Sequence, residues 1–476
     1  MNKKFLITNI ALLPVLFFNT ACSKDEAIPP IVVEPLPELP EVGMIHKYKA
    51  PLYWSVYEYC YELEKRGVGA SDMDISPFQW DDILDWVSRE LLPYGYDMVC
   101  TDGFIPMEAK DASGYMTHYG STSLKDLVSK CKEKGLRLGI YDNPLWIHGA
   151  DNTKIPGTNY TFANLHYSGK TPVRNPNSKD LWFSWVAVEN PGAREYIEGF
   201  FKHYSDLGVQ FIRMDFLSWF EDGQDRGMGI VGKGYGRESY ERALAYIAES
   251  AEKYGIFTSL VMPHLYNDAE YESKYGNMFR IVADTGDGGW SQCSARDRGK
   301  AYPNWPNCNN MFDGFIYWSH LSGRNKVILD GDFIRLNKFE TDSEKEFVIS
   351  LQLMAGGPVA VADQRSTIGE NTKYYTNEEL LDLNKDGFVG YPVSDKLGDP
   401  DNEIWVGQLT SGDYVIGIFN RSDNSKSYSY SLTDIGLSGE YSARDLWSHA
   451  DEGLVSSIDV SVAPHGCKIL RLSKNI

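Results

Sequence analysis

Several short apolar segments of this chain end at an aspartate. One of them, Val-Gln-Phe-Ile-Arg-Met at 209–214, is followed directly by Asp215. Apolar runs of this length predict strands that are buried on both faces, as they are in a parallel sheet. Further aspartates end similar runs, namely Asp102, Asp142, Asp284, Asp330 and Asp332. All strands of a parallel barrel end at one mouth, so these carboxylates are expected to converge there.

Helical and strand segments alternate between residues 45 and 371. Amphipathic helices, each followed by a strand, are predicted at 80–92 and 97–101, 123–134 and 136–141, 191–207 and 209–214, and 235–253 and 256–261. Repeated units of this kind favour an α/β fold, a parallel (β/α)8 TIM barrel over residues 45–371. An open doubly wound sheet is the alternative. No Gly-x-Gly-x-x-Gly sequence follows the first strand, so the dinucleotide-binding version of that fold has little support.

The sequence changes character after residue 371. Short segments rich in Val, Ile, Tyr and Ser, separated by Gly, Asp and Asn, occur at 403–409, 413–420, 426–432, 441–446 and 467–472. This pattern is typical of antiparallel strands. We therefore predict a second domain, an antiparallel β-sandwich over residues 372–476.

The N-terminus has the pattern of an export signal. A Met-Asn-Lys-Lys start precedes apolar residues 5–18. Asn-Thr-Ala-Cys at 19–22 resembles the cleavage box of bacterial lipoproteins, which predicts a signal peptide at 1–21 and lipidation of Cys22; an ordinary signal peptide is the alternative. The following Ser-Lys-Asp-Glu resembles the surface-export signal of Bacteroidetes lipoproteins. With a Pro-rich tether at 22–44, the protein is expected to be anchored in the outer membrane, at the cell surface or on the periplasmic face.

Charge and cysteine spacing exclude some classes of partner. The net charge of −20 would repel the phosphates of nucleic acid. No spacing of cysteines or histidines matches a zinc site, and we expect no metal or other cofactor. Residues 382–387 mimic the start of a calcium loop, but its twelfth position would be Val393, whose side chain cannot bind calcium. Cys293 and Cys308 are candidates for a disulfide, with buried free thiols as the alternative.

Six segments together resemble glycoside hydrolase family 27, the α-galactosidase (melibiase) family, over nearly all of residues 45–476. They are Tyr-Gly-Tyr-Asp-Met-Val-Cys-Thr-Asp at 94–102, Gly-Leu-Arg-Leu-Gly-Ile-Tyr at 135–141, Arg-Met-Asp at 213–215, Arg-Ile-Val-Ala-Asp at 280–284, Asp-Gly-Asp at 330–332 and Leu-Met-Ala-Gly-Gly-Pro at 353–358. Each segment is a weak signal alone, whereas their order and spacing are specific.

The resemblance implies hydrolysis with retention of configuration, by double displacement. Asp215 would attack the anomeric carbon, and Asp284 would act as the acid and base. Arg213 takes the place of the family's lysine and would keep Asp215 ionised by lowering its pKa.

The resemblance also implies residues that bind the substrate. Arg280 would hydrogen-bond ring hydroxyls near the 2-position, Asp102 would bind hydroxyls at the far end of the sugar, and Trp54 would pack against the ring. Asp142, at another strand end, is expected to add a polar contact at the same mouth.

Two departures from the family pattern bear on the substrate. The family has two adjacent aspartates, which hold the 4- and 6-hydroxyls, where this chain has Asp102 and Gly103. The family's fifth-strand recognition loop is replaced by Val-Met-Pro-His at 261–264. His264 would either contact a sugar hydroxyl or be a structural histidine.

The expected function is therefore an exo-glycosidase that acts on terminal α-linked galactose-like residues of an oligosaccharide or polysaccharide. β-L-Arabinopyranosidase, α-N-acetylgalactosaminidase and isomaltose-releasing dextranase activities are alternatives on the same scaffold. A glycan-binding lipoprotein without activity is the rival from another class, and the presence of both catalytic aspartates disfavours it.

Overall fold

The computed structural model describes residues 36–43, 49–166, 184–225, 229–232, 234–285, 288–295, 301–302 and 305–474. The predicted signal peptide and Cys22 lie outside these residues. Among the helices so described, none has both the length and the apolar character needed to cross a membrane.

Eight parallel strands form the centre of the larger domain, as predicted. They are β1 (Leu52–Ser55), β2 (Met98–Cys100), β6 (Arg137–Tyr141), β9 (Phe211–Met214), β12 (Phe257–Leu260), β13 (Met278–Arg280), β16 (Ile328–Asp330) and β17 (Val359–Val361). Their order in the sheet is β16-β13-β12-β9-β6-β2-β1-β17. Nearly every residue of these strands is buried, which accounts for their uniformly apolar sequences.

The barrel closes through an irregular segment rather than through a regular strand pair. Ile334, just beyond β16, forms a parallel bridge with Val361 of β17. The Ile334 amide donates to the Ala360 carbonyl and the Ala362 amide donates to the Ile334 carbonyl, both at 2.9 Å. The two ends of the sheet are thereby joined.

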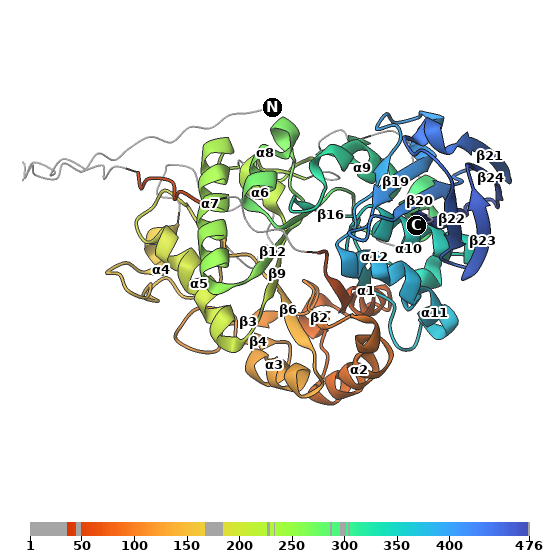
Figure 1. The fold of residues 1–476 in the computed structure, drawn as a ribbon. Helices are drawn as coiled ribbons and strands as arrows, with labels where there is room; N and C mark the ends of the chain where they lie inside the picture. Colours follow the sequence, from red (N-terminus) through yellow and green to blue (C-terminus); the bar gives the residue numbers. More distant parts are fainter. Residues whose placement is uncertain are drawn as a thin grey trace, which may run out of the picture. The chain divides into compact units, whose positions relative to one another are not determined.

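Helices surround this sheet. The principal ones are α1 (Tyr57–Lys65), α2 (Pro77–Glu90), α3 (Leu124–Glu133), α5 (Ala193–Leu207), α7 (Arg237–Tyr254), α8 (Tyr266–Tyr275), α9 (Met311–Trp318) and α10 (Asp342–Met354). Figure 1 shows α5 and α7 side by side on the outside of the strands. Their ends follow local chemistry: Ser76 caps α2 with Pro77 next to it, and Gly208 and Gly255 end α5 and α7 with positive φ of 95° and 66°.

The β/α loops contain further short strands and helices. They are the strands β3 (Met107–Glu108), β4 (His118–Tyr119), β5 (Thr122–Ser123), β7 (Trp146–Ile147), β8 (Ser184–Trp185), β10 (Gln224–Asp225), β11 (Gly229–Ile230), β14 (Ala301–Tyr302) and β15 (Trp305–Cys308), with the helices α4 (Phe162–Leu165) and α6 (Leu217–Glu221).

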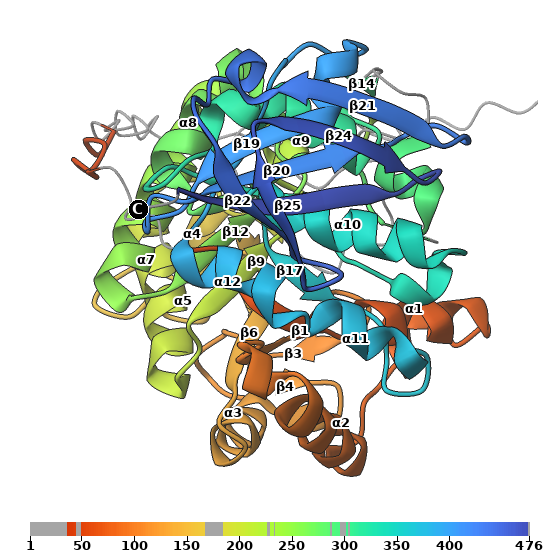
Figure 2. The same cartoon turned by 45° about the vertical axis from the view of Figure 1, so that its right-hand side comes forward.

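The C-terminal strands form a six-stranded antiparallel sheet and a separate pair (Figure 2). The sheet has the order β18 (Tyr391–Pro392), β19 (Ile404–Gln408), β20 (Tyr414–Phe419), β25 (Cys467–Lys474), β22 (Tyr441–Asp445) and β23 (Ala450–Val455), and β21 (Lys426–Ser431) pairs with β24 (Ser457–Val462). The sandwich prediction is confirmed, although β18, β23 and β24 are strands that it missed. Between the barrel and these strands, residues 372–386 form α11 (Thr372–Tyr375) and α12 (Glu378–Asp386).

A buried ion pair joins the sandwich to the barrel. The Arg421 guanidinium donates to Asp313 of α9 at 2.8 Å and to the Ser294 hydroxyl at 2.6 Å. Both charged side chains are at most 5% exposed. The ion pair therefore attaches the segment around Ser294, which comes after Asp284 in the chain, to the sandwich.

Two details differ from candidates in the sequence. Cys293 and Cys308 are free and buried, as are most of the other described cysteines, so the candidate disulfide is absent. The calcium-like segment belongs to α12 and its C-terminal cap, and Asp386 there forms an ion pair with Arg324.

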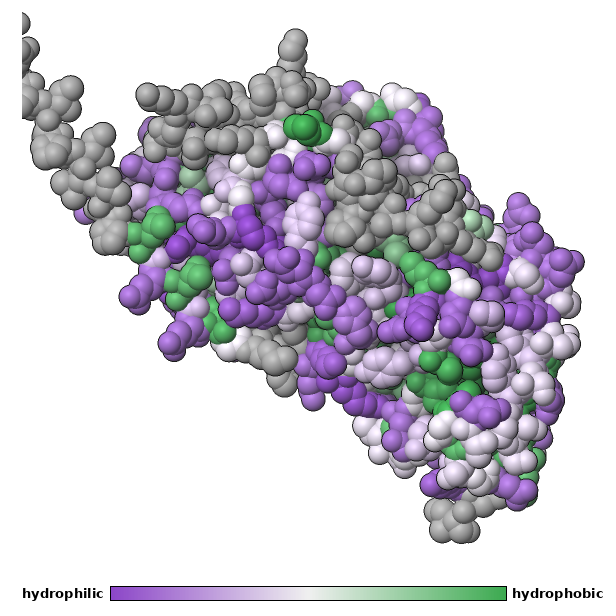
Figure 3. Space-filling view, turned by 90° about the horizontal axis from the view of Figure 1, so that it is seen from above, coloured by the Kyte–Doolittle hydropathy of each residue, from purple (hydrophilic) through white to green (hydrophobic). Residues whose placement is uncertain are grey.

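Seen from above, the described surface is mostly hydrophilic, with hydrophobic residues in small separate patches (Figure 3).

Candidate active site

Three carboxylates meet at the C-terminal ends of the barrel strands. Asp102 follows β2, Asp215 follows β9 and Asp284 lies four residues beyond Arg280 at the end of β13. They are close enough to interact electrostatically, because the charge of Asp284 raises the pKa of Asp215 and the charge of Asp215 raises that of Asp102. The structure thus brings together the three carboxylates on which the predicted chemistry depends.

Asp215 is fixed from both sides. The Phe216 amide donates to its Oδ1 at 2.7 Å, and the Tyr141 hydroxyl donates to its Oδ2 at 2.8 Å. Phe216 has a positive φ of 62°, which is strained for a residue with a side chain. Burial raises the pKa of Asp215, whereas the Arg280 guanidinium and the two hydrogen bonds lower it.

Arg213 has a different role from the one predicted. Its guanidinium donates to Asp330 at 2.9 Å and to Asp332 at 2.8 Å, and it lies 4.5 Å from the centre of the Phe333 ring. It is 1% exposed. The prediction that Arg213 holds Asp215 ionised is therefore corrected, because Arg213 is paired with two other carboxylates and the cation that lowers the pKa of Asp215 is Arg280.

Arg280 links the two predicted catalytic groups. Its Nη1 lies 2.6 Å from Asp284 Oδ1 and 3.6 Å from Asp332 Oδ1. The Arg280 side chain is 3% exposed, whereas that of Asp284 is 48% exposed. Asp284 is thus the carboxylate that faces solvent, and Asp215 is the enclosed one.

Asp102 is 5% exposed, and its Oδ1 accepts from the Gly103 amide at 2.8 Å. Burial, opposed by Arg213, raises its pKa to about 7. A β-carbon at Gly103 would lie 2.5 Å from a ring carbon of Tyr141. The space that a second aspartate would enter is therefore filled by the phenol that hydrogen-bonds to Asp215.

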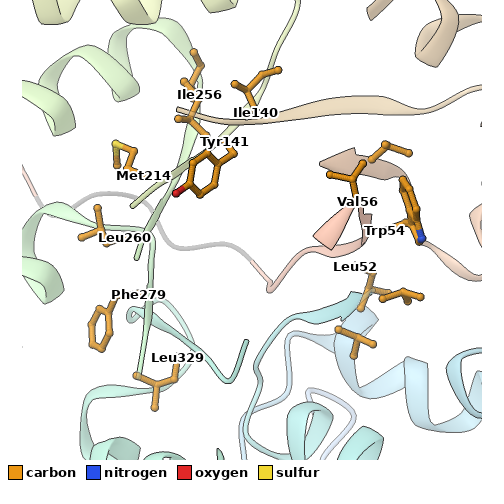
Figure 4. Close-up of a cluster of buried hydrophobic side chains, with 14 of the residues drawn as sticks. Leu52, Trp54, Val56, Ile140, Tyr141, Met214, Ile256, Leu260, Phe279 and Leu329 are labelled. Atoms are coloured by element: carbon orange, nitrogen blue, oxygen red, sulfur yellow. The ribbon is translucent and has the colours of Figure 1, made fainter. Parts of the chain in front are cut away.

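Trp54 and Asp142 do not reach the mouth, contrary to prediction. Trp54 is 1% exposed, donates from Nε1 to the Asp363 carbonyl at 2.9 Å and lies among buried hydrophobic side chains (Figure 4). Asp142 is 2% exposed and accepts from the hydroxyl of Tyr204 on α5 at 2.6 Å. Both side chains occupy the layer between the strands and the helices.

His264 is also buried, so the expectation of a contact with the sugar is corrected in favour of a structural histidine. Its Nε2 lies 3.0 Å from Asp222 Oδ1, and its ring stacks on that of Tyr266 at 4.9 Å. Asp222 also accepts from the Tyr266 hydroxyl at 2.8 Å. His264 therefore ties the loop after β12 to the loop after β9.

The sequence did not single out Tyr57, Tyr141 or Phe333. Tyr57 follows β1 and its ring stacks on Phe333 at 4.5 Å, so these two rings border the floor formed by Arg213. The signals available for Tyr141 were its place at the end of β6, immediately before Asp142, and at the end of the family-like segment 135–141.

A cavity of about 1050 Å³ lies at the opposite end of the barrel. Its lining includes the first residues of several strands, namely Leu52, Met98, Arg137, Phe211, Phe257 and Ile328. It is thus remote from the three carboxylates and takes no part in their chemistry. Among the described residues no group of three or more His, Cys, Asp or Glu side chains could hold a metal ion.

The sandwich resembles a known domain. Residues 399–472 match the α-galactosidase C-terminal β-sandwich domain. The chain is 24% identical to an α-galactosidase of Oryza sativa subsp. japonica over 398 residues, which are 82% of this chain and 78% of that relative.

A more similar relative covers most of the chain. An isomalto-dextranase of Arthrobacter globiformis is 36% identical over 442 residues, which are 89% of this chain and 67% of that relative. The structure of the Arthrobacter globiformis T6 isomalto-dextranase complexed with panose superposes with a TM-score of 0.81 at 34% identity, over 93% of this chain and 76% of that one. A family 27 β-L-arabinopyranosidase from Geobacillus stearothermophilus shares the fold, with a TM-score of 0.68 at 22% identity over 90% and 97% of the two chains.

The barrel, the sandwich and the strand-end carboxylates all agree with these similarities. The chain belongs to glycoside hydrolase family 27 and is a glycoside hydrolase.

Proposed function

We propose that this glycoside hydrolase is a retaining exo-enzyme that acts on an α-linked glucan and releases isomaltose. The observation that carries this proposal is the single carboxylate at the far end of the site. Asp102 has only Gly103 beside it, and the Tyr141 ring fills the place of a second acid. A galactoside would lose one hydrogen-bond acceptor there, which costs about 1–3 kcal/mol for a buried hydroxyl. The similarity to an isomalto-dextranase supports the same choice.

In the first step Asp215 attacks the anomeric carbon while Asp284 donates its proton to the leaving oxygen. The bond from that carbon to the leaving oxygen breaks, and an ester between the sugar and Asp215 forms. Two inversions at one carbon give net retention. In the second step Asp284 accepts a proton from water, whose oxygen displaces Asp215.

The electrostatics of the site suit the proposed roles of Asp215 as nucleophile and of Asp284 as acid and base. Asp215 has to be ionised to attack, and Arg280, the Phe216 amide and the Tyr141 hydroxyl all favour its charged form against the effect of burial. Asp284 has to exchange a proton with the leaving group and with water, and its exposed position allows both.

A galactose-like substrate is the second candidate. It is favoured by Asp102, which keeps one of the two acids that the family uses for the 4- and 6-hydroxyls, and by the similarity to α-galactosidases. α-N-Acetylgalactosaminides and β-L-arabinopyranosides belong to the same group of candidates.

A panel of substrates tests the choice. We expect dextran to yield isomaltose, and we expect kcat/KM for 4-nitrophenyl α-isomaltoside to exceed those for the α-galactoside, the α-N-acetylgalactosaminide and the β-L-arabinopyranoside. A galactoside preferred by about a thousandfold would show that Gly103 is compensated and that the glucan proposal is wrong. No turnover of any glycoside would favour a glycan-binding protein.

The catalytic pair is tested by substitution. Asp215→Asn keeps the shape but removes the attacking charge, so kcat should fall by several orders of magnitude with the fold intact.

Asp284→Ala should reduce turnover most for poor leaving groups. Azide should restore turnover of an activated substrate and give a glycosyl azide of retained configuration. Equal losses on good and poor leaving groups, without rescue by azide, would contradict the role of Asp284.

The pH profile tests the contact between Tyr141 and Asp215. A hydrogen bond to the carboxylate lowers its pKa, so Tyr141→Phe should raise the pKa of Asp215. The acid limb of kcat/KM should then move to higher pH, while the plateau changes by less than about tenfold, the contribution of one such hydrogen bond. Tyr204→Phe is the matched control, because that hydroxyl donates to Asp142 instead. An unmoved acid limb in Tyr141→Phe would contradict the assignment.

We also propose that Cys22 carries a lipid anchor to the outer membrane. The support is the cleavage box at 19–22 that follows a positive and apolar leader. Cys22→Ser should release the protein from the membrane fraction or stop its maturation, as measured by fractionation and by the mass of the mature chain. Unchanged membrane association in that variant would show that the anchor lies elsewhere.

A further inference from the structure

Aromatic rings from helix α1 and from the loops after β2 and β16 pack in a row beside the catalytic floor. Tyr57 lies at the centre: its ring centroid is 4.5 Å from that of Phe333, 5.8 Å from that of Tyr61 and 6.4 Å from that of Phe104. Tyr57 and Tyr61 lie in α1, the helix after β1. Phe104 follows β2 two residues after Asp102, and Phe333 follows β16. The mechanism described above uses none of these rings.

The row is covered on its inner side and open on its outer side. Phe333 and Tyr57 are buried, at 3% and 7% exposure. Phe104 and Tyr61 are partly exposed. Two large aromatic side chains thus present surface to solvent while their neighbours fix them from behind.

An ion network holds Tyr61 in place. The Arg335 guanidinium lies 4.9 Å from the centre of the Tyr61 ring and donates to Glu58 at 3.1 Å and to Glu62 at 2.8 Å. Lys338 lies 3.5 Å from Glu62, and both of these side chains are partly exposed. A rigid aromatic surface bordered by charged hydrogen-bonding groups can bind a pyranose, whose faces carry C–H bonds and whose edges carry hydroxyls.

The position of the row relates it to one side of the cleaved bond. The leaving group lies at Asp284, beyond β13, so the sugar held by Asp215 extends away from β13 towards Asp102, beyond β2. Strand β1 is the next neighbour of β2 in the sheet. A second sugar on the non-reducing side would therefore lie at the rim of β1 and β2, where Tyr61 and Phe104 are found.

We propose that Phe104 and Tyr61 form a stacking platform for this second, non-reducing glucosyl residue of an α-1,6-linked chain. This inference rests on the proposed glucan activity and adds to it the residues that select a disaccharide unit over a single sugar. Binding of the second residue lowers KM and positions the first residue for attack by Asp215.

Two glycosides that differ only in the second residue test the platform in the full-length protein. For Phe104→Ala and Tyr61→Ala, kcat/KM for 4-nitrophenyl α-isomaltoside should fall by about tenfold, which is the contribution of one well-placed ring. The value for 4-nitrophenyl α-glucoside should change by less than about twofold. Phe104→Leu, which keeps apolar volume but lacks a flat ring, should behave as Phe104→Ala does.

Tyr317→Ala is the matched control, because Tyr317 is 47% exposed at the C-terminal end of α9, away from the mouth. It should leave both substrates unaffected. Equal losses on both substrates in the Phe104 variants, or no loss on either, would overturn the platform.

A binding measurement separates this inference from the proposed function. By titration calorimetry, isomaltose should bind the wild-type protein about tenfold more tightly than glucose, and Phe104→Ala should remove the difference. If the wild type releases isomaltose from dextran but the variant keeps the difference, the platform is wrong and the function stands. If the wild type prefers galactosides and does not bind isomaltose, both are wrong.

Discussion

The buried cluster of Arg213, Asp330 and Asp332 is the interaction on which the catalytic mouth depends. It joins β9 to the segment after β16 across the inside of the barrel, and all three side chains are at most 2% exposed. Removing the arginine would leave Asp330 without a cation and Asp332 with only its longer contact to Arg280, and breaking a buried pair costs about 3–5 kcal/mol. Asp332 also accepts from the amide of Thr285, next to Asp284, at 2.7 Å. The cluster therefore helps to position both predicted catalytic residues, Asp215 through Arg213 and Asp284 through Thr285.

This cluster also explains how cations and carboxylates are distributed at the mouth. Arg213 is paired with Asp330 and Asp332. Arg280 is therefore the guanidinium that lies against Asp284 and lowers the pKa of Asp215. Asp102 is buried, and its pKa is raised to about 7 although Arg213 opposes the effect of burial. Burial thus raises the pKa of both Asp102 and Asp215, and an arginine opposes this effect at each of them, Arg213 at Asp102 and Arg280 at Asp215.

The sequence predicted the elements of the barrel because their pattern is local, but it could not predict where individual side chains point. The strands are buried on both faces, so Tyr53, Trp54 and their neighbours show no alternation that separates inward from outward positions, and a shift of one residue reverses the face. The prediction that Trp54 lies at the mouth is therefore wrong, and Tyr57, three residues later, lies there. Asp142 and Asp215 end strands in the same way, and only the neighbouring Tyr204 of α5 distinguishes the buried structural carboxylate from the catalytic candidate.

The change from aspartate to glycine at position 103 shows why a substitution in such a site cannot be understood alone. A side chain at 103 and the ring of Tyr141 would occupy the same space, with 2.5 Å between the new β-carbon and a ring carbon. The ring could move, but its hydroxyl donates to Asp215, and movement would weaken the hydrogen bond that helps to keep this carboxylate charged. Recognition at the far end of the sugar is thereby coupled to the reactivity of the group that attacks its anomeric carbon. A change of specificity at position 103 therefore requires a compensating change at position 141.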